Sequence, residues 1–389
     1  MDYKKYFSAD TESFMRSPVR EIFRKVDLSQ IYSFAGGYPS AETFPLETIK
    51  KLSAQVLEKY GAKALQYGAT QGVPELREVI SKRYDVPVEN IQITTSSQQG
   101  IDVCTRVLVD PGDVVLTTNP TYLGALQSFK SYRAEVEGVD MAQSFEAAQS
   151  RERQIADLLA AGRKIKFFYA IPDFQNPSGQ TLTLAQRSEL VALARKYDFL
   201  IVEDSPYREL RYEGDPVATI YSLAPERTLH LGSFSKIMAP GFRLGWVIGA
   251  PELLDMIYVC KQSLDLCPPI MDQYMAAEFM GSGELDKNLA RTIELYRGKR
   301  DHLLGLLEKY MPAGVSWTHP EGGLFLFVTL PESYDTVALY DRALAAGVAY
   351  VAGSFFYVDG SHKNTMRLNF SFLDTERMEP GIKLLASLL

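Results

Sequence analysis

The sequence predicts an α/β protein in which a large domain, built on a mostly parallel central sheet between helices, precedes a smaller α+β domain. Short runs rich in β-branched and aromatic residues alternate with helical stretches, which is typical of βαβ units. These runs are largely apolar on both faces, which indicates strands buried between two helix layers. The predicted elements are strands at 91–95, 114–118, 165–171, 199–203, 228–232 and 244–249, and a helix at 184–197.

The pattern of predicted strands and helices changes after about residue 285. A long helical segment is followed by three further strands without βαβ alternation, which indicates the smaller α+β domain. These elements are predicted at 290–310, 323–330, 347–352 and 365–372. We therefore expect three parts, namely an N-terminal segment (1–44) that packs with the small domain and the site, a large domain (45–284) and a small domain (285–389).

The composition is that of a globular protein and excludes several classes of function. Hydrophobic residues make up 46% of the chain and charged residues 23%, and no stretch approaches the roughly 18 apolar residues of a membrane span. The net charge is −7 without a basic run, so neither nucleic acid nor a membrane is expected as a partner. Three cysteines and four scattered histidines indicate neither a disulfide framework nor a metal site. No apolar signal segment is present, so the cytoplasm is the expected compartment.

Polar residues follow the predicted strands, where an open parallel sheet binds its ligands. Ser97 lies where a helix begins after strand 91–95, so it belongs either to a phosphate cradle or to a plain serine cap. Tyr122 offers an aromatic ring that stacks on a planar heterocycle or packs in the core. Asn176 lies in a turn and either donates to a phenolic oxygen or is an ordinary turn residue.

Two further strand ends carry ionisable residues. Asp204 ends an apolar run, and a buried carboxylate there needs a cationic partner such as a pyridinium nitrogen, unless it only caps a turn. Tyr207, three residues on, is placed to hydrogen-bond the phenolic oxygen of the same ring. Lys236 is flanked by hydroxyls and followed by Arg243, the setting of a Schiff-base lysine that holds a phosphorylated aldehyde. The simpler alternative for Lys236 is a solvated lysine after a strand.

Taken together, these motifs carry a resemblance to a known family. From about residue 17 to its C-terminus, the chain resembles the fold-type I, pyridoxal-phosphate-dependent aminotransferases of class I/II. More narrowly, it is similar to the 2-aminoadipate/kynurenine aminotransferase branch, which is related to the aminotransferase-like domain of MocR-type regulators. The motifs are SFAGGYPSAETFP (33–45), SSQQGIDV (96–103), DPGD (110–113), NPTYLGAL (119–126), SFSK (233–236) and MRLNFS (366–371).

The resemblance implies a role for each matching residue. Lys236 holds pyridoxal phosphate, Asp204 pairs with its pyridinium nitrogen, and Tyr122 stacks on its ring. Asn176 and Tyr207 bind the phenolic oxygen. The implied phosphate ligands are Ser97, the Gln98 backbone, Ser233, Ser235, Arg243 and, from the other subunit of a homodimer, Tyr67.

The resemblance also implies substrate contacts. Arg367 binds the substrate α-carboxylate beside Asn176, whereas without the family it would be read as an exposed strand arginine. Arg20 pairs with a distal carboxylate at the mouth of the site, unless it is a plain surface arginine. Apolar side chains enter past Gly37 and Tyr38. Mild departures from the family pattern, such as Ser96 where a glycine is usual, put in doubt only the fine substrate preference.

The implied activity is a ping-pong amino transfer. The amino group of 2-aminoadipate, glutamate, or an aromatic or aliphatic L-amino acid passes to a 2-oxo acid such as 2-oxoglutarate, with Lys236 as covalent anchor and then general base. Two alternatives stay open, a non-catalytic regulatory module of MocR type that senses pyridoxal phosphate and a pyridoxal-phosphate-dependent decarboxylase or lyase. A MocR-type regulator would carry a DNA-binding domain ahead of this region.

Overall fold

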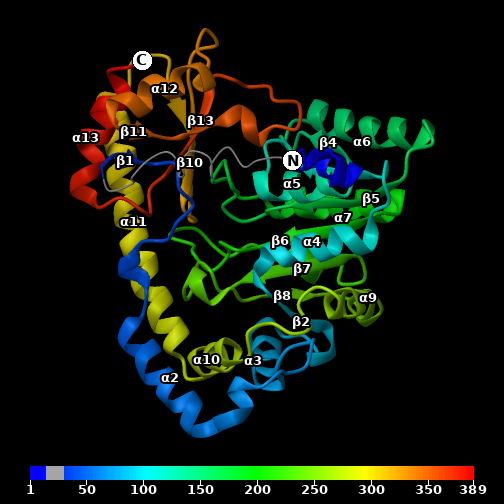
Figure 1. The fold of residues 1–389 in the computed structure, drawn as a ribbon. Coiled ribbons are helices and arrows are strands. Elements are labelled where there is room, and N and C mark those ends of the chain that lie inside the picture. The colour runs from blue at the N-terminus through cyan, green and yellow to red at the C-terminus, as the bar shows by residue number, and fades with distance from the viewer. Residues whose placement is uncertain (15–29) are drawn as a thin grey trace.

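The computed structural model describes residues 1–14 and 30–389 (Figure 1). Within these residues, seven strands form one large sheet in the order β2-β8-β7-β6-β5-β3-β4. All neighbouring strands pair in parallel except β8, which is antiparallel to both β2 and β7. The strands are β2 (Ile91–Thr94), β3 (Val114–Thr118), β4 (Glu135–Val139), β5 (Ile165–Ala170), β6 (Leu200–Asp204), β7 (Thr228–Ser233) and β8 (Gly245–Ile248). The predicted, mostly parallel sheet is confirmed.

Sequence patterns did not predict β4, which forms one edge of this sheet. Its residues, EVEGV, are exposed or half-buried apart from Val139, because an edge strand in this position has only β3 beside it. A polar edge strand lacks the continuous apolar run by which the buried strands are found. It is therefore invisible to a search for apolar segments.

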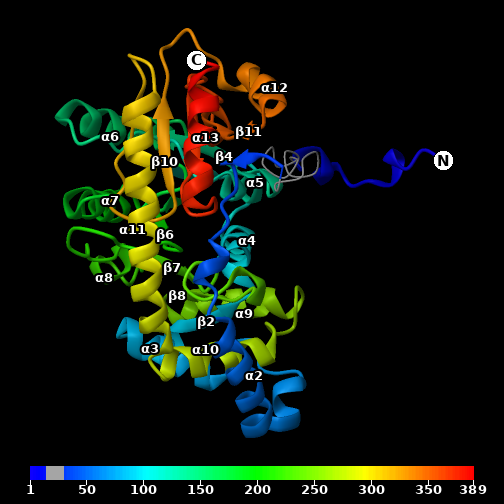
Figure 2. The same ribbon diagram turned by 90° about the vertical axis from the view of Figure 1, so that its left-hand side faces the viewer.

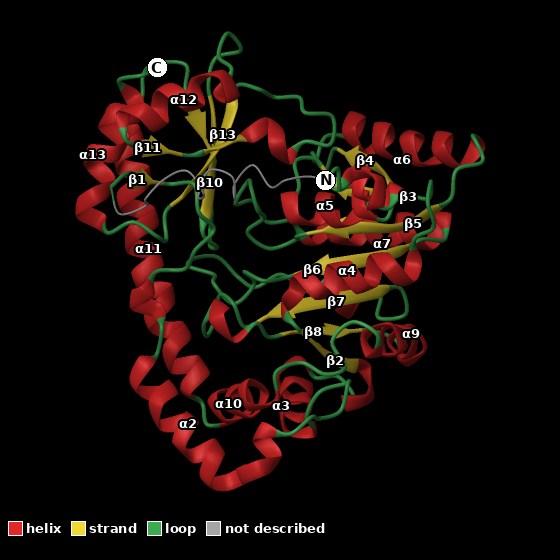
Figure 3. Ribbon diagram, viewed as in Figure 1, coloured by secondary structure: helices red, strands yellow, loops and turns green. Residues whose placement is uncertain are grey.

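Helices cover both faces of the large sheet (Figure 3). Alternating residues of β5 show the two layers, since Phe167 packs with the core under α4 and α5, whereas Phe168 packs with the core under α6 to α8. The helices are α4 (Ser96–Leu108), α5 (Leu123–Ser131), α6 (Phe145–Ala160), α7 (Leu184–Tyr197) and α8 (Ile220–Leu223). The carboxyl ends of the parallel strands thus point to one edge, between these layers.

Helix α7 shows how local sequence sets an element. It begins after Thr183, whose side chain accepts a hydrogen bond from the Gln186 backbone while the Gln186 side chain accepts one from the Thr183 backbone. It ends at Asp198, which adopts a left-handed conformation. The predicted bounds of this helix, 184–197, are confirmed because the start and stop signals both lie next to the helix in the sequence.

Four more helices surround the β2–β8 end of the sheet. Helix α10 packs against both α2 and α3, and α9 packs against α4 and β2. The four are α2 (Leu46–Tyr60), α3 (Pro74–Tyr84), α9 (Pro251–Gln262) and α10 (Ile270–Gly281).

The C-terminal part is organised around the long helix α11 (Glu284–Tyr310), which runs from α10 to α13 (Figure 2). It begins six residues before the predicted helical segment. Its antiparallel sheet has the order β12-β13-β10-β9. The other elements are β9 (Ser316–Trp317), β10 (Phe325–Thr329), α12 (Thr336–Ala346), β12 (Val351–Ala352), β13 (Thr365–Asn369) and α13 (Thr375–Ala386).

One predicted strand, 347–352, is two strands with different partners. β11 (Val348–Ala349) pairs in parallel with β1 (Tyr32–Ser33), whereas β12 pairs with β13. Between them, Tyr350 donates its hydroxyl to the Thr336 carbonyl at 2.6 Å. Strand β1 therefore pairs with the C-terminal part, and the boundaries predicted at 44/45 and 284/285 stay predictions.

None of the helices in residues 1–14 and 30–389 is long and apolar enough to cross a membrane.

Candidate active site

A cavity of about 1140 Å³ opens at the carboxyl ends of the parallel strands, beside the small sheet. Its lining combines residues from the large sheet, the start of α4, the turn after β7, and β13. The predicted site residues that line it are Gly37, Tyr38, Ser97, Gln98, Tyr122, Asn176, Asp204, Tyr207, Ser233, Ser235, Lys236, Arg243 and Arg367. The structure therefore brings together residues that are spread over more than 300 positions of the chain.

The N-terminus of α4 forms one end of the cavity. The helix begins at the buried Ser96, whose φ of 67° lies in the left-handed region and explains why a glycine is usual there. Gly245 of β8 packs so closely on this turn that a Cβ atom there would lie 2.7 Å from the Ser97 backbone nitrogen. The N-cap is Thr95, without a side-chain capping bond, so Ser97 is not a plain serine cap. The free N–H groups of this turn make an anion cradle.

Further polar groups gather around the same helix end. Arg243 donates from Nη2 to the Ser96 hydroxyl at 2.6 Å, although the rest of its side chain is exposed. Ser233 ends β7, and its hydroxyl accepts a hydrogen bond of 3.1 Å from the Ser235 backbone. One cation and several hydroxyls thus lie beside a helix N-terminus, which suits a phosphate group.

Lys236 follows β7 in a tight turn and is partly buried. Its Nζ donates to the Gly37 carbonyl at 2.9 Å. Burial, and next the positive charges of Arg367 and Arg243, lower the pKa of this amine to about 8. The alternative of a solvated lysine is therefore wrong, and a larger fraction of this amine is neutral and nucleophilic at physiological pH than in an ordinary lysine.

Asp204 is the last residue of β6 and is buried. Its Oδ2 accepts a hydrogen bond of 2.7 Å from the Tyr169 hydroxyl, whereas Oδ1 has no hydrogen-bond partner in the described part of the chain. Burial raises the pKa of this carboxyl to about 6, against the opposing effects of Tyr169 and His230. A buried carboxylate oxygen without a partner fits the N–H of a protonated pyridine ring.

The neighbouring carboxylate, Glu203, has a structural role. Successive residues of a strand point to opposite faces, so Glu203 turns away from the cavity. It accepts hydrogen bonds from the backbone nitrogens of Ile220 at 3.0 Å and Tyr221 at 2.9 Å, at the start of α8. Capping, the alternative considered for Asp204, is thus the function of its neighbour.

Arg367 lies in β13 and is buried, so the expectation of an exposed strand arginine is wrong. Its guanidinium donates from Nη1 to Asn176 Oδ1 at 2.7 Å and from Nη2 to the Ala35 carbonyl at 2.6 Å. Its Nε has no partner among the described residues, and its Cζ lies 4.3 Å from the centroid of the Phe325 ring. Burial lowers the pKa of Arg367 to about 10, which leaves a cation ready for a carboxylate.

Two tyrosines complete the wall of the cavity. Tyr122 precedes α5, and its ring lies close over Gly124, where a Cβ atom would meet it at 2.6 Å. Tyr207 is buried, and burial followed by the neighbouring Tyr122 raises the pKa of its hydroxyl well above the usual value. A tyrosine that stays protonated is a hydrogen-bond donor at any physiological pH.

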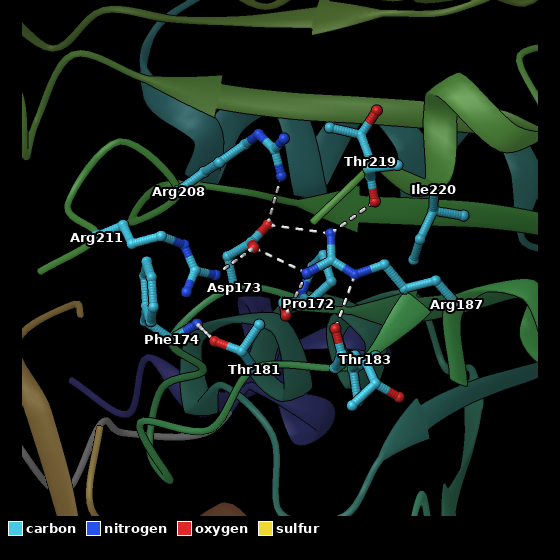
Figure 4. A network of polar contacts seen from close by, with 12 residues as sticks. Pro172, Asp173, Phe174, Thr181, Thr183, Arg187, Arg208, Arg211, Thr219 and Ile220 are labelled. Atoms are coloured by element: carbon cyan, nitrogen blue, oxygen red, sulfur yellow. Dashed lines mark hydrogen bonds and ion pairs between the residues drawn. The ribbon is translucent and has the colours of Figure 1, made fainter. Parts of the chain in front are cut away.

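The loop that carries Asn176 is anchored by a buried ion pair that sequence patterns did not reveal (Figure 4). Asp173 Oδ1 accepts from the fully buried Arg187 at 2.8 Å, and Arg208 approaches Oδ2 at 3.1 Å. Arg187 also donates to the carbonyls of Pro172 and Leu182, each at 3.0 Å. In the sequence, an arginine on a helix face is normally solvated, so nothing indicated this network.

One predicted site residue among the described residues, Tyr67, does not line the cavity. Tyr67 is 79% exposed and lies in the segment between α2 and α3. Arg20 lies outside the described residues. Residues 1–14 and 30–389 also contain no group of three His, Cys, Asp or Glu side chains that would hold a metal ion.

A mostly parallel sheet whose strand ends present a lysine, an unpaired aspartate oxygen and an anion cradle defines a fold-type I pyridoxal-phosphate enzyme. Comparison with known proteins gives the family. Residues 34–385 match the aminotransferases of class I and II, and the chain belongs to this family.

Three relatives show how close the similarity is. Aromatic-amino-acid aminotransferase 1 of Thermococcus litoralis is 44% identical, over 99% of this chain and 94% of that protein. The crystal structure of Pyrococcus horikoshii kynurenine aminotransferase in complex with PMP, KYN and KYA superposes with a TM-score of 0.95 at 42% identity, covering 100% of this chain and 97% of the other. The crystal structure of the α-aminoadipate aminotransferase of Thermus thermophilus, complexed with N-(5'-phosphopyridoxyl)-L-leucine, superposes with a TM-score of 0.91 at 32% identity. The match covers 100% of this chain and 98% of the other.

The protein is accordingly an aminotransferase whose cofactor is pyridoxal phosphate. The residues present fit this group, because the cavity offers an amine, a partnerless buried carboxylate oxygen and an anion cradle in one space.

Proposed function

We propose that this protein is a broad-specificity aminotransferase that accepts 2-aminoadipate, glutamate, and aromatic and aliphatic L-amino acids, with 2-oxoglutarate as amino acceptor. The observation that carries the proposal is the sharing of one cavity by the Lys236 amine, the free Asp204 oxygen and the buried Arg367 guanidinium. The relatives support the proposed broad substrate specificity, since their names include aromatic, kynurenine and α-aminoadipate aminotransferases.

Each residue of the site then has a chemical task. Bound pyridoxal phosphate supplies an electron sink for the carbanion left when the α-proton departs. The Lys236 amine would hold the cofactor covalently and, once free, would carry the α-proton of the amino acid as general base and acid. Asp204 keeps the pyridine nitrogen protonated. The two half-reactions follow one another in a ping-pong sequence.

Binding and orientation fall to the remaining residues. Arg367 pairs with the substrate α-carboxylate, and its bond to Asn176 links this clamp to the ligands of the phenolic oxygen, Asn176 and Tyr207. Tyr122 covers the ring. The proposed phosphate ligands are Ser97, the Gln98 backbone, Ser233, Ser235 and Arg243.

The working unit is proposed to be a homodimer. Tyr67 is exposed in one chain and outside its own cavity, so its proposed contact with phosphate requires the cavity of a partner subunit. The adjacent Leu65 is 71% exposed, and Phe44, Leu46 and Phe242 line an apolar groove close to the start of α2. Such apolar surface supports an interface between two copies of the chain. The cytoplasm remains the proposed compartment, which the three free cysteines support.

The decisive experiment is a single half-reaction followed by absorbance. Addition of an L-amino acid alone to the holoenzyme should convert the cofactor from its pyridoxal to its pyridoxamine form, and 2-oxoglutarate should reverse the change. Release of CO₂ or ammonia without this conversion would support a decarboxylase or lyase. No change with any amino acid would support the regulatory module. Steady-state kinetics with 2-aminoadipate, glutamate, kynurenine, leucine and phenylalanine then measures how broad the substrate specificity is.

A further inference from the structure

We propose that Tyr169 is a positioning residue for the cofactor, because its hydroxyl holds one oxygen of Asp204 and so directs the other toward the pyridine nitrogen. The structure shows one hydroxyl on Oδ2, at 2.7 Å, and Oδ1 without a partner in the described residues. This inference rests on the proposed role of Asp204 and adds a residue that determines how Asp204 performs it.

The fold leaves the Tyr169 hydroxyl little freedom. Tyr169 lies in β5 opposite Val202 of β6, and its side chain points to the same face as that of Asp204, two residues further along β6. The side chain is fully buried, and its ring meets Phe129 edge-on with centroids 5.4 Å apart. Packing thus holds the ring while the hydroxyl reaches the carboxylate.

The other ionisable groups around Asp204 do not replace this contact. His230 of β7 influences Asp204 electrostatically, but its Nδ1 lies 3.0 Å from Glu203 Oε2 and is engaged there. The negative charge of Asp204 also acts on Cys104 of α4 and on Tyr207 beyond the end of β6, without a hydrogen bond between them. Among the described side chains, Tyr169 alone makes a hydrogen bond with Asp204. The orientation of the Asp204 carboxylate therefore depends on the hydroxyl of Tyr169.

The hydroxyl also influences protonation. Burial raises the pKa of Asp204, and the hydrogen bond from Tyr169 opposes that effect by stabilising the ionised form. Burial and the Asp204 charge raise the pKa of Tyr169 itself well above its usual value, so Tyr169 stays a donor. Removal of the hydroxyl should raise the pKa of Asp204 above about 6 and leave more of it protonated near neutral pH.

The test is the pH dependence of cofactor affinity in Tyr169→Phe, a change that keeps the ring and its packing. The dissociation constant of pyridoxal phosphate is measured with full-length, cofactor-free protein between pH 5.5 and pH 8.5. The quantity of interest is the ratio of the constants of variant and wild type. The titrations of the cofactor and of Lys236 are common to both proteins and cancel in this ratio.

The expected ratio follows from linkage. Above pH 8, Asp204 is ionised in both cofactor-free proteins, so the ratio should be at its smallest and should report only the loss of orientation. Between the wild-type pKa of about 6 and the raised pKa, mainly the variant must first lose a proton from Asp204, so the ratio should increase as the pH falls, by up to about 10-fold, the effect of a shift of about one pKa unit. A ratio that does not change with pH would overturn the inference.

A second measurement reads the ring nitrogen directly in the holoenzyme. With pyridoxal phosphate labelled with ¹⁵N in the ring, the chemical shift in Tyr169→Phe should move from the protonated toward the neutral pyridine value. A more basic carboxylate draws the shared proton toward itself. An unchanged shift would contradict the inference.

Two further variants separate the possible failures. Tyr350→Phe removes another fully buried hydroxyl, 2.6 Å from the Thr336 carbonyl in the C-terminal part, and should lower thermal stability without changing the affinity ratio or the chemical shift. Asp204→Asn should weaken cofactor binding. If it does and Tyr169→Phe gives a flat ratio, only the role of Tyr169 is overturned. Cofactor binding unchanged in Asp204→Asn would overturn the proposed role of Asp204, and this inference with it.

Discussion

Arg367 of the small sheet donates a 2.7 Å hydrogen bond to the side-chain oxygen of Asn176, in the loop that follows β5 of the large sheet. The two residues are 191 positions apart in the chain. The contact occupies the amide oxygen of Asn176 and leaves its amide nitrogen as a donor. The proposed carboxylate clamp and the proposed ligand of the cofactor's phenolic oxygen are therefore set by one interaction.

Replacement of Arg367 should weaken the binding of every substrate to a similar extent. Arg367→Ala is expected to raise KM for amino acids and 2-oxo acids by about 10- to 100-fold, since a charge-assisted contact commonly contributes about 1.5–3 kcal/mol. Steady-state kinetics of both half-reactions measures this effect. The exposed Arg342 of α12 provides the control, because Arg342→Ala should leave KM unchanged for amino acids and for 2-oxo acids. An effect on only one class of substrate would show that Arg367 contacts the substrate side chain and not the α-carboxylate that all substrates share.

Replacement of Lys236 should separate cofactor binding from turnover. Lys236→Ala is expected to bind pyridoxal phosphate without the yellow, borohydride-sensitive absorbance of the covalently held form. Turnover should fall by about 10²–10⁴-fold from loss of the general base alone. Absorbance spectra before and after borohydride, together with steady-state rates, measure both effects. Yellow, active Lys236→Ala protein would assign the anchor to another lysine.

The lowered pKa of Lys236 predicts a pH profile for cofactor attachment. Because burial and the charges of Arg367 and Arg243 favour the neutral amine, the rate of attachment to cofactor-free protein should increase with pH, with a midpoint near pH 8, and level off at higher pH. Arg367→Gln removes one of the charges and should shift this midpoint to higher pH. Stopped-flow absorbance measures the rate. A midpoint that stays the same in Arg367→Gln would show that Arg367 does not influence the amine.

The ion pair beneath the Asn176 loop predicts an effect on stability. Asp173→Asn leaves the fully buried Arg187 without its carboxylate partner and should lower the free energy of unfolding by about 3–5 kcal/mol. The control is Asp198→Asn, which breaks an exposed pair with Arg227 and should cost about 1 kcal/mol or less. Denaturant unfolding of both variants gives the comparison. Equal losses would show that the buried pair contributes no more than a surface pair.

Arg20, outside the described residues, gives a prediction about substrate choice. If it pairs with a distal carboxylate, Arg20→Ala should raise KM for 2-aminoadipate and glutamate by about 10-fold or more. KM for leucine and phenylalanine should change little. Equal losses for both classes would show that Arg20 supports the fold and does not read the side chain.

Much of the framework could be predicted because its signals are local. The bounds of α7 follow from Thr183 and Asp198, which lie directly beside the helix. The buried strands follow from continuous apolar runs. The position of the cavity follows from the rule that ligands bind at the carboxyl ends of parallel strands. The exposed edge strand β4 carried no such signal and was missed.

By itself, the sequence determined the alternation of buried strands and helices in the large sheet and, through its motifs, the residues of the expected cofactor site. Only the tertiary structure decided which groups meet, such as Tyr169 with Asp204, Arg367 with Asn176 and Arg187 with Asp173. The physical reason is the range of the forces involved. Helix caps and strand patterns act over a few residues, whereas hydrogen bonds and burial depend on packing that joins positions far apart in the chain.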